Sequence, residues 1–417
     1  MTTSDADQCA PSGQPLLSVE QGRQRIIDAV QAIEATERLA LLEAIDRILA
    51  EPVISAIDVP PFANSAMDGY ALRAGDCSDA AVRLTVIGES FAGRPFEGRV
   101  GDGQCVRIMT GAVMPAGADT VIMQEHVSRT GDSIGITRQP RSGENVRLAG
   151  EDTRRGDRVL ATGTRLGAAE AGLLASVGVA EVQVRRRVQA AFFSTGDELT
   201  AVGTPLAPGQ IYDSNRYTLY TLLSRAGVVC HDLGVVADDR DAVRSAFRRA
   251  GEIADLVVTS GGVSVGEADY VTETLRELGE IDFWRMAMKP GKPLAFGRLQ
   301  RAWFFGLPGN PVSVMATFYQ FVLPAIRKLQ GETPRPPLVL QARCTEPLRK
   351  SRGRMEFQRG ILCQDAQGEW TVASTGKQGS HLLSSMSRAN CFILLTAESA
   401  GAEAGDLVSV QPFCDFA

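Results

Sequence analysis

The feature that most constrains this fold is an alternation of apolar β-like runs with helical stretches, which begins at Val188 and continues to about residue 330. Runs such as VQAAFF (188–193) and ADLVVTS (254–260) are each followed by a segment whose apolar residues recur at helical spacing. This alternation predicts a mostly parallel sheet with right-handed crossovers and helices on both faces. Ligands of such sheets bind at the carboxyl ends of the strands, where this chain has glycine-rich turns.

The rest of the chain predicts further domains, because 417 residues are too many for one core. Helical spacing after Ser18 predicts a first helix, LLEAIDRILA (41–50) a second, and GAAEAGLLASVG (167–178) a third, which we expect to pack with the first helix around a β module. The chain is thus expected to be multidomain α/β plus β. We predict a disordered tail (1–17), a discontinuous N-terminal domain (18–51 plus 150–186), an all-β module (52–149), a central α/β/α domain (187–330) and a small C-terminal β domain (331–417).

Composition argues against several classes of protein. The 43 basic and 49 acidic residues give a net charge of −6, so no global field favours nucleic acid or an acidic membrane. Eight cysteines without a C-x-x-C pair and only three histidines argue against a disulfide framework, a zinc site and a Ser-His-Asp triad. The longest uncharged stretch, 302–326, is broken by glycine and proline, and the polar N-terminus lacks a signal-peptide pattern. We therefore expect a reduced, intracellular protein without nucleic-acid or membrane partners.

Two loops are candidate anion sites. In TSGGVSVGEADY (259–270), consecutive glycines before a helix let backbone N–H groups converge on an anion, although neither common phosphate motif is present. The alternative is a ligand-free turn, with Asp269 as a helix cap. In KPGKP (289–293), two lysines on a stiff turn favour an oxyanion, whereas solvated surface lysines are the alternative. LPGNPVS (307–313) adds a helix start at Pro311 capped by Asn310, which could equally be helix-start chemistry alone.

Four carboxylates border predicted strand ends and could bind Mg²⁺ together, although each alone is more typical of a cap or a surface charge. They are Glu198, Asp213, Asp238 and Asp269. A magnesium ion bridging phosphate oxygens promotes anhydride cleavage without histidine or cysteine. The loops PPFANSAMDGYAL (60–72) and RIMTGAVMP (107–115) read as turns on physical grounds alone.

Taken together, the ordered motifs resemble the molybdopterin molybdenumtransferase family, to which the gephyrin E domain belongs. The motifs are PPFANSAMDGYA, RIMTGA, GEDTRRGD, STGDEL, GQIYDSN, TSGGVSVGEADY, KPGKP, LPGNPVS, FQRG and QGSHLLSS. The resemblance implies an elongated N-terminal domain, a barrel-like C-terminal domain and a cytoplasmic homodimer with its active site at the subunit interface. It implies that molybdenum from molybdate is inserted into adenylylated molybdopterin with Mg²⁺-dependent release of AMP, and that molybdopterin adenylyltransferase and molybdoenzymes make transient contacts with the protein.

The resemblance also assigns site residues. The implied catalytic residues are Asp68, Thr110, Asp152, Glu198, Asp238 and Asp269, of which Glu198, Asp238 and Asp269 serve the metal. The implied ligand-binding residues are Asp213, Asn215, Ser260, Gly261, Gly262, Ser264, Lys289, Lys292, Pro308, Pro311, Ser313, Arg354, Arg359 and Ser380. Asp68, Thr110 and Asp152 are expected to act in the crevice of the partner subunit. The chain departs from the family pattern at Arg285, where many members carry lysine.

Two other functions fit parts of the pattern. A molybdopterin adenylyltransferase would use similar glycine loops one step earlier, and would release pyrophosphate from ATP. A non-catalytic scaffold like gephyrin would bind a peptide at its dimer surface, and turnover without a peptide would argue against it.

Overall fold

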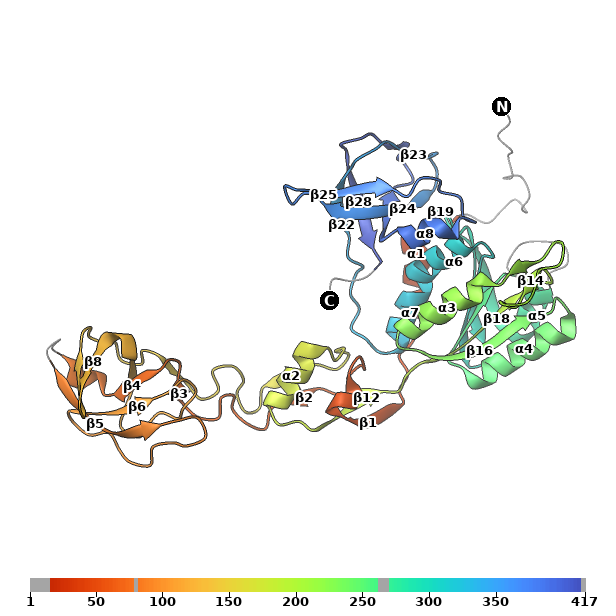
Figure 1. The fold of residues 1–417 in the computed structure, drawn as a ribbon. Coiled ribbons are helices and arrows are strands. Elements are labelled where there is room, and N and C mark those ends of the chain that lie inside the picture. Colours follow the sequence, from red (N-terminus) through yellow and green to blue (C-terminus); the bar gives the residue numbers. More distant parts are fainter. Residues whose placement is uncertain (1–15, 79–81, 262–269, 414–417) are drawn as a thin grey trace. The chain divides into compact units, whose positions relative to one another are not determined.

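The computed structural model describes residues 16–78, 82–261 and 270–413 (Figure 1). The chain folds into two compact units, of which the first combines residues 1–37 with 185–417 and the second spans 38–184. Throughout these described ranges, every helix is too short or too polar to cross a membrane.

The core of the first unit is a six-stranded sheet in the order β16-β13-β17-β21-β20-β18. Its strands are β13 (Gln189–Thr195), β16 (Val229–Val236), β17 (Leu256–Ser260), β18 (Gly279–Arg285), β20 (Pro293–Leu299) and β21 (Ala302–Leu307). Four neighbouring strands, from β16 to β21, run parallel, and β20 and β18 add antiparallel pairings. The prediction of a mostly parallel sheet is therefore confirmed.

Helices cover both faces of this sheet. Adjacent residues of a strand point to opposite faces, so neighbouring aromatic residues make both faces apolar. Phe192 and Phe305 pack on one face with helices α3 (Ser214–Arg225), α6 (Pro311–Thr317) and α7 (Leu323–Leu329). The π-helical turn η4 (Phe318–Val322) connects α6 to α7. Phe193 and Phe304 pack on the other face with α4 (Arg240–Ile253) and α5 (Tyr270–Leu278). A short parallel pair, β14 (Leu199–Thr200) and β15 (Ile211–Tyr212), follows β13.

The first helix, α1 (Val19–Ala29), belongs to the first of these cores. Ser18 and Gln21 form the predicted capping box. Val19, Ile26 and Val30 are buried in the same cluster as Phe321 of η4. The expected packing of this helix against residues 167–178 is therefore wrong, because its apolar face is already covered within the first unit.

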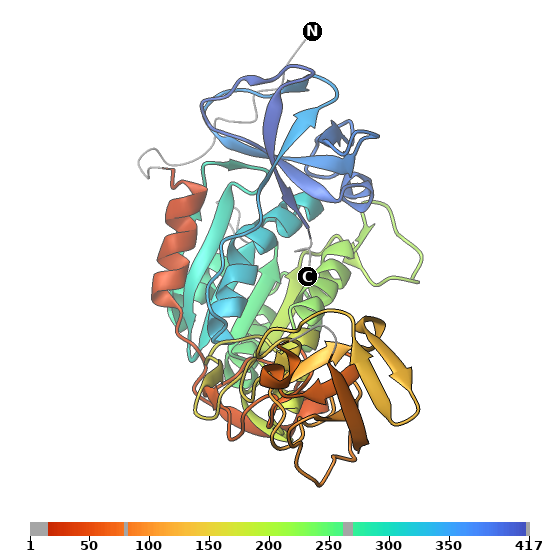
Figure 2. The same ribbon diagram turned by 90° about the vertical axis from the view of Figure 1, so that its left-hand side faces the viewer.

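A small β-barrel completes the first unit (Figure 2, blue). Its strands are β22 (Leu340–Cys344), β24 (Met355–Gln364), β25 (Trp370–Ser374), β26 (Cys391–Leu395) and β28 (Leu407–Pro412), with β19 (Met288–Lys289) added beside β24 and the pair β23 (Leu348–Arg349) and β27 (Gly401–Ala402) nearby. Pairing of β24 with both β25 and β26 closes the ring. Helix α8 (Leu383–Arg388) precedes β26. The barrel-like C-terminal fold is confirmed.

The second unit contains a six-stranded sheet in the order β7-β4-β6-β5-β9-β8. Its strands are β4 (Gly69–Leu72), β5 (Arg83–Ser90), β6 (Gln104–Ile108), β7 (Thr120–Met123), β8 (Val127–Thr130) and β9 (Ser133–Ile136), with short helical turns η2 (Ala74–Cys77) and η3 (Gln124–His126). Two-stranded pairs join β1 (Thr36–Ala40) to β12 (Glu181–Arg185), β2 (Val53–Ile54) to β11 (Arg158–Leu160) and β3 (Asn64–Ser65) to β10 (Val146–Arg147).

The two helical segments expected in this unit have different outcomes. Residues 167–178 contain helix α2 (Ala168–Ser176), whose Leu174 is buried with Ala44 and Leu49. The helix predicted over 41–50 is wrong, because only the 3₁₀ turn η1 (Leu41–Ala44) forms there. Asp46 takes a positive φ of 62°, and the N–H groups of Asp46 and Leu49 donate to the carbonyls of residues 166 and 164 instead of continuing a helix.

Candidate functional site

A pocket of about 1040 Å³ lies where the carboxyl ends of β17 and β21 meet the barrel. Five segments of the first unit line it: the end of β17, the turn before β20, the turn before α6, and two barrel segments. The lining residues are Gly261, Met288, Lys289, Pro290, Gly291, Lys292, Pro293, Pro308, Gly309, Asn310, Ser313, Arg354, Gln378, Gly379, Ser380 and His381. The pocket therefore brings together both predicted lysines with Gly261, Pro308, Ser313, Arg354 and Ser380.

The turn that carries the two lysines is built by unusual backbone geometry. Lys289 ends β19, opposite Glu356 of β24, and its Nζ lies 3.1 Å from Glu356 Oε1. The backbone N–H of Met286 donates to the Lys292 carbonyl at 2.7 Å, which closes the turn. Gly291 has a φ of +105°, and a Cβ there would lie 2.7 Å from Thr317 Cγ2. Glycine is therefore needed at this position to place both ammonium groups on one pocket wall.

The glycines at the two strand ends approach each other closely. Gly261, with a φ of +88°, donates its N–H to the Leu307 carbonyl at 3.1 Å. A Cβ on Gly309 would lie 4.0 Å from the Gly261 Cα, and Asn215 Nδ2 donates to the Gly309 carbonyl at 2.7 Å. Pro311 begins α6 as predicted, whereas the Asn310 side chain makes no capping hydrogen bond.

A chain of buried polar side chains runs beneath this edge of the sheet. Ser260 Oγ lies 3.0 Å from Ser194 Oγ, and Ser194 Oγ donates to Asp213 Oδ1 at 3.1 Å. Asp213 is only 2% exposed and caps α3 by accepting the Arg216 N–H at 3.1 Å. Arg216 also pairs with Asp232.

Two acceptors in this region still have bonding capacity. Among the described residues, the buried Asp213 Oδ2 and Asn215 Oδ1 find no hydrogen-bond partner, although Arg216 Nε lies 3.6 Å from Asp213 Oδ2. Burying an unsatisfied acceptor costs about 1–3 kcal/mol. A ligand that donates N–H groups would recover this energy.

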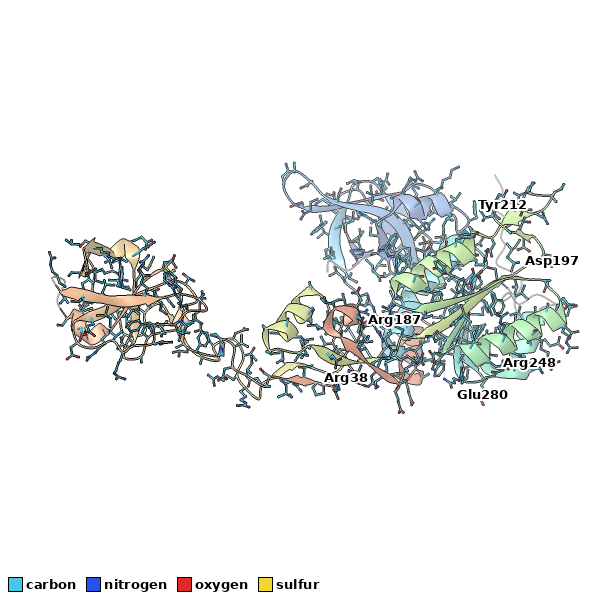
Figure 3. All side chains as sticks on the ribbon, turned by 60° about the horizontal axis from the view of Figure 1, so that its bottom comes forward. Arg38, Arg187, Asp197, Tyr212, Arg248 and Glu280 are labelled. Carbon is cyan, nitrogen blue, oxygen red and sulfur yellow. The ribbon has the colours of Figure 1, made fainter. Side chains whose placement is uncertain are left out.

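The predicted metal carboxylates are only partly described. Asp238 and Glu198 are exposed after β16 and β13, while Asp269 lies outside the described residues, as do Gly262 and Ser264. Among the residues that the structure describes, no group of three potential ligands converges. In Figure 3, Arg187 lies just before the start of β13 and Asp197 lies just after its end. The Asp197 Oδ1 accepts a hydrogen bond from the Asp238 N–H at 3.1 Å.

Asp197 was not selected from the sequence, although it stands beside Glu198 in STGDEL and contacts the backbone of Asp238. The carboxylates of these segments suit Mg²⁺, which commonly uses one or two protein carboxylates together with substrate phosphates.

Arg359 supports the pocket from behind and does not line it. Its side chain is 1% exposed and donates to Ser385 Oγ at 3.0 Å and to the Gly379 carbonyl at 3.1 Å. Burial lowers the pKa of this guanidinium to about 10. Gln378 accepts the Arg359 N–H at 2.8 Å. Arg359 thus holds the loop that presents Ser380.

Three other residues of this loop, Gln378, Gly379 and His381, also line the pocket but were not predicted from the sequence. All three lie in the QGSHLLSS motif, from which only Ser380 was selected. Their position beside Ser380 was the available signal.

Three predicted residues lie in the second unit. Asp68 accepts hydrogen bonds from the Thr110 N–H at 2.8 Å and the Thr110 hydroxyl at 2.7 Å. These two bonds, the backbone bond first, lower the pKa of the Asp68 carboxyl. Asp152 is exposed, and its backbone N–H donates to the Val59 carbonyl at 3.0 Å. The structure thus brings Asp68 and Thr110 together.

Three family models match consecutive parts of the chain. Residues 17–178 match the MoeA N-terminal region (domains I and II), residues 191–328 match a probable molybdopterin-binding domain, and residues 341–413 match the MoeA C-terminal region (domain IV).

Whole proteins match as well. The chain is 47% identical over 400 residues to a molybdopterin molybdenumtransferase of Haemophilus influenzae, covering 95% of this chain and 99% of that protein. It is 42% identical over 328 residues to one from a Nostoc species, covering 76% and 75%. The crystal structure of a molybdopterin biosynthesis moeA protein from Pyrococcus horikoshii superposes with a TM-score of 0.84 at 30% identity, over 96% of this chain and all of that one.

Proposed function

Because this chain belongs to the molybdopterin molybdenumtransferase family, we propose that it inserts molybdenum from molybdate into adenylylated molybdopterin and releases AMP. The chain is a transferase of molybdenum cofactor biosynthesis. The observation that carries the finer proposal is one pocket whose lining includes two lysines, an arginine and Ser380 together with Gly261 and Gly309.

Molybdate would bind at the cationic wall of this pocket. Lys289, Lys292 and Arg354 supply positive charge, and Ser380 supplies a hydroxyl donor. A dianion is attracted to a protein of net charge −6 only where local cations reverse the potential. The structure describes such a concentration of cations at this wall.

The pterin and its phosphate would bind along the glycine loops and the buried polar chain. Asp213 and Asn215 have acceptors that no described residue satisfies, and these acceptors suit the N–H groups of a pterin ring. Ser260 and Gly261 lie at the end of β17, and Ser313 lines the pocket. Gly262, Ser264, Pro308 and Pro311 complete the proposed binding set.

AMP release would take place beside the carboxylates that follow β13 and β16. Glu198, Asp238 and Asp269 would hold magnesium, which when bound neutralises charge on the phosphoanhydride. We assign Asp68, Thr110 and Asp152 to the same reaction, contributed by the partner subunit of a cytoplasmic homodimer. The hydrogen bonds from Thr110 lower the pKa of Asp68 and so favour its ionised form, which can accept a hydrogen bond or contact a cation.

The division between the two substrates can be tested with Lys292→Ala. We expect molybdate-dependent turnover to fall at least about tenfold, because a cation in the oxyanion wall is lost, while binding of adenylylated pterin changes about twofold or less. Lys377→Ala is the matched control, since Lys377 is exposed next to the pocket loop and does not line the pocket. Equal losses of molybdate use and pterin binding in Lys292→Ala would contradict the assignment.

A molybdopterin adenylyltransferase would consume ATP and unmodified molybdopterin. Incubating the protein with both substrates and measuring pyrophosphate separates the two reactions. We expect no pyrophosphate here, and AMP only when adenylylated pterin is supplied.

A further inference from the structure

One charged residue at the edge of the pocket has no role in the function proposed above. Glu356 lies on β24, two residues after Arg354, and is 5% exposed. An ionised carboxylate this deeply buried requires bonding partners. Its position beside a wall of cations indicates that it acts on those cations.

The contacts of Glu356 connect the barrel to the pocket. Its Oε1 pairs with Lys289 Nζ at 3.1 Å, and its Oε2 accepts from Gln358 Nε2 at 2.9 Å. Gln358 is itself buried and also donates to the Arg349 carbonyl at 2.9 Å. The carboxylate is therefore fixed from the barrel side, while the Lys289 side chain is 52% exposed toward the pocket.

The direct cross-strand register places the two side chains of this pair next to each other. Lys289 of β19 stands opposite Glu356 of β24 in a parallel ladder. A half-exposed lysine without a fixed partner samples many rotamers, and holding it in one orientation costs side-chain entropy. The ion pair restricts Lys289 before any ligand arrives.

The same carboxylate reduces the positive charge that an incoming anion meets. Lys289 faces Glu356 directly, and burial lowers the pKa of the Arg359 guanidinium, an effect that the charge of Glu356 offsets only in part. A negative charge beside the pocket repels a bound dianion, and partial burial limits screening by water. Glu356 thus opposes the attraction of the lysines and Arg354 while keeping Lys289 in place.

The geometry points to Glu356 as a residue that positions Lys289 and limits the affinity of the pocket for its oxyanion. This inference rests on the function proposed above, in which that anion is molybdate. An anion held too tightly in the ground state raises the barrier to its own transfer, so a carboxylate in the wall favours exchange over storage.

The test compares molybdate binding by calorimetry at two salt concentrations in full-length variants. Glu356→Gln keeps the shape and an acceptor for Lys289 and removes the charge. Glu356→Asp keeps the charge and shortens the reach to Lys289. Glu369→Gln is the matched control, because it removes the same charge from an exposed barrel pair with Arg343 away from the pocket.

We expect Glu356→Gln to bind molybdate about three- to tenfold more tightly, with a steeper loss of affinity at high salt. Glu356→Asp is expected to bind about as tightly as the unmodified protein or more weakly, and Glu369→Gln to be unchanged. Damage to the barrel would lower affinity, so tighter binding cannot arise from misfolding. Unchanged or weaker binding by Glu356→Gln, with normal binding by the unmodified protein, would overturn the inference alone. Absence of molybdate binding by the unmodified protein would overturn the proposed function as well.

Discussion

The residues of the candidate site differ in how well the sequence alone predicted their positions. Two lysines so close in the sequence, Lys289 and Lys292, predicted a site for an anion. Both lysines do line one pocket. Arg359 was assigned to ligand binding by its motif, yet it is buried behind the pocket, because sequence spacing does not reveal which side of a barrel strand faces a ligand. Asp197 was missed because its carboxylate bonds a backbone N–H from the distant residue Asp238.

The Asp68 carboxyl provides a pH prediction at this scale. Its folded pKa is lower than the ordinary 3.8, so its stabilising contribution is complete above that value and is lost as the pH falls through the folded pKa. Thr110→Val removes the hydroxyl bond and keeps the backbone bond, so we expect the Asp68 pKa to rise part of the way toward 3.8. Carboxyl ¹³C shifts followed by NMR measure this, with Thr110→Ser as the control. An unshifted pKa in Thr110→Val would assign the effect to the backbone alone.

Arg359 provides a stability prediction. Arg359→Met leaves the Gly379 carbonyl and the Ser385 hydroxyl without their donor, so we expect the free energy of unfolding to fall by about 1–3 kcal/mol. Arg343→Met, which removes a half-exposed arginine from the same barrel, should change it by about 0.5 kcal/mol or less. Urea denaturation compares the two. Equal effects would show that Arg359 does not support the loop.

At the scale of elements, the sequence predicted strands best where both faces of a strand carry apolar side chains. Phe192 and Phe193 enter opposite cores, which is why the α/β pattern was readable without the structure. The segment 41–50 was misread because most of its backbone N–H groups with a partner outside the η1 turn donate to residues 164, 166, 180 and 183, more than a hundred positions away. Helical spacing records local preference and contains no information on such distant pairing.

The lysine turn provides a prediction at this scale. Gly291 and Gly353 have nearly equal φ angles, +105° and +107°, but only at Gly291 would a Cβ meet another atom, Thr317 Cγ2 at 2.7 Å. We expect Gly353→Ala to lose about 1–2 kcal/mol of stability from backbone strain alone. Gly291→Ala should lose more, and should also bind molybdate more weakly because Lys289 and Lys292 move. Calorimetry and urea denaturation measure both quantities, and identical behaviour of the two variants would refute the steric argument.

At the scale of the whole molecule, the ordered motifs predicted the family, and the comparisons confirm it. The α/β sheet and the barrel form one compact unit, and their contact creates the pocket. The boundaries proposed for the tail and the domains, the homodimer and the magnesium ion stay predictions.

The proposed homodimer can be tested by mixing two inactive variants. If Asp68 of one subunit serves Lys289 of its partner, dimers formed from Asp68→Ala and Lys289→Ala chains contain one intact site. Co-expression should then restore about a quarter of the wild-type turnover, since half of the dimers are mixed. Mixed dimers verified by mass that show no turnover would place both residues in a site within a single subunit.

The central claim is that the pocket between the sheet edge and the barrel receives molybdate. Anomalous diffraction from a crystal soaked in molybdate, recorded at the molybdenum absorption edge, tests it most directly. The account predicts a peak within hydrogen-bonding distance of Lys289 Nζ, Lys292 Nζ and Ser380 Oγ. A peak elsewhere on the protein, with this pocket empty at saturating molybdate, would contradict it.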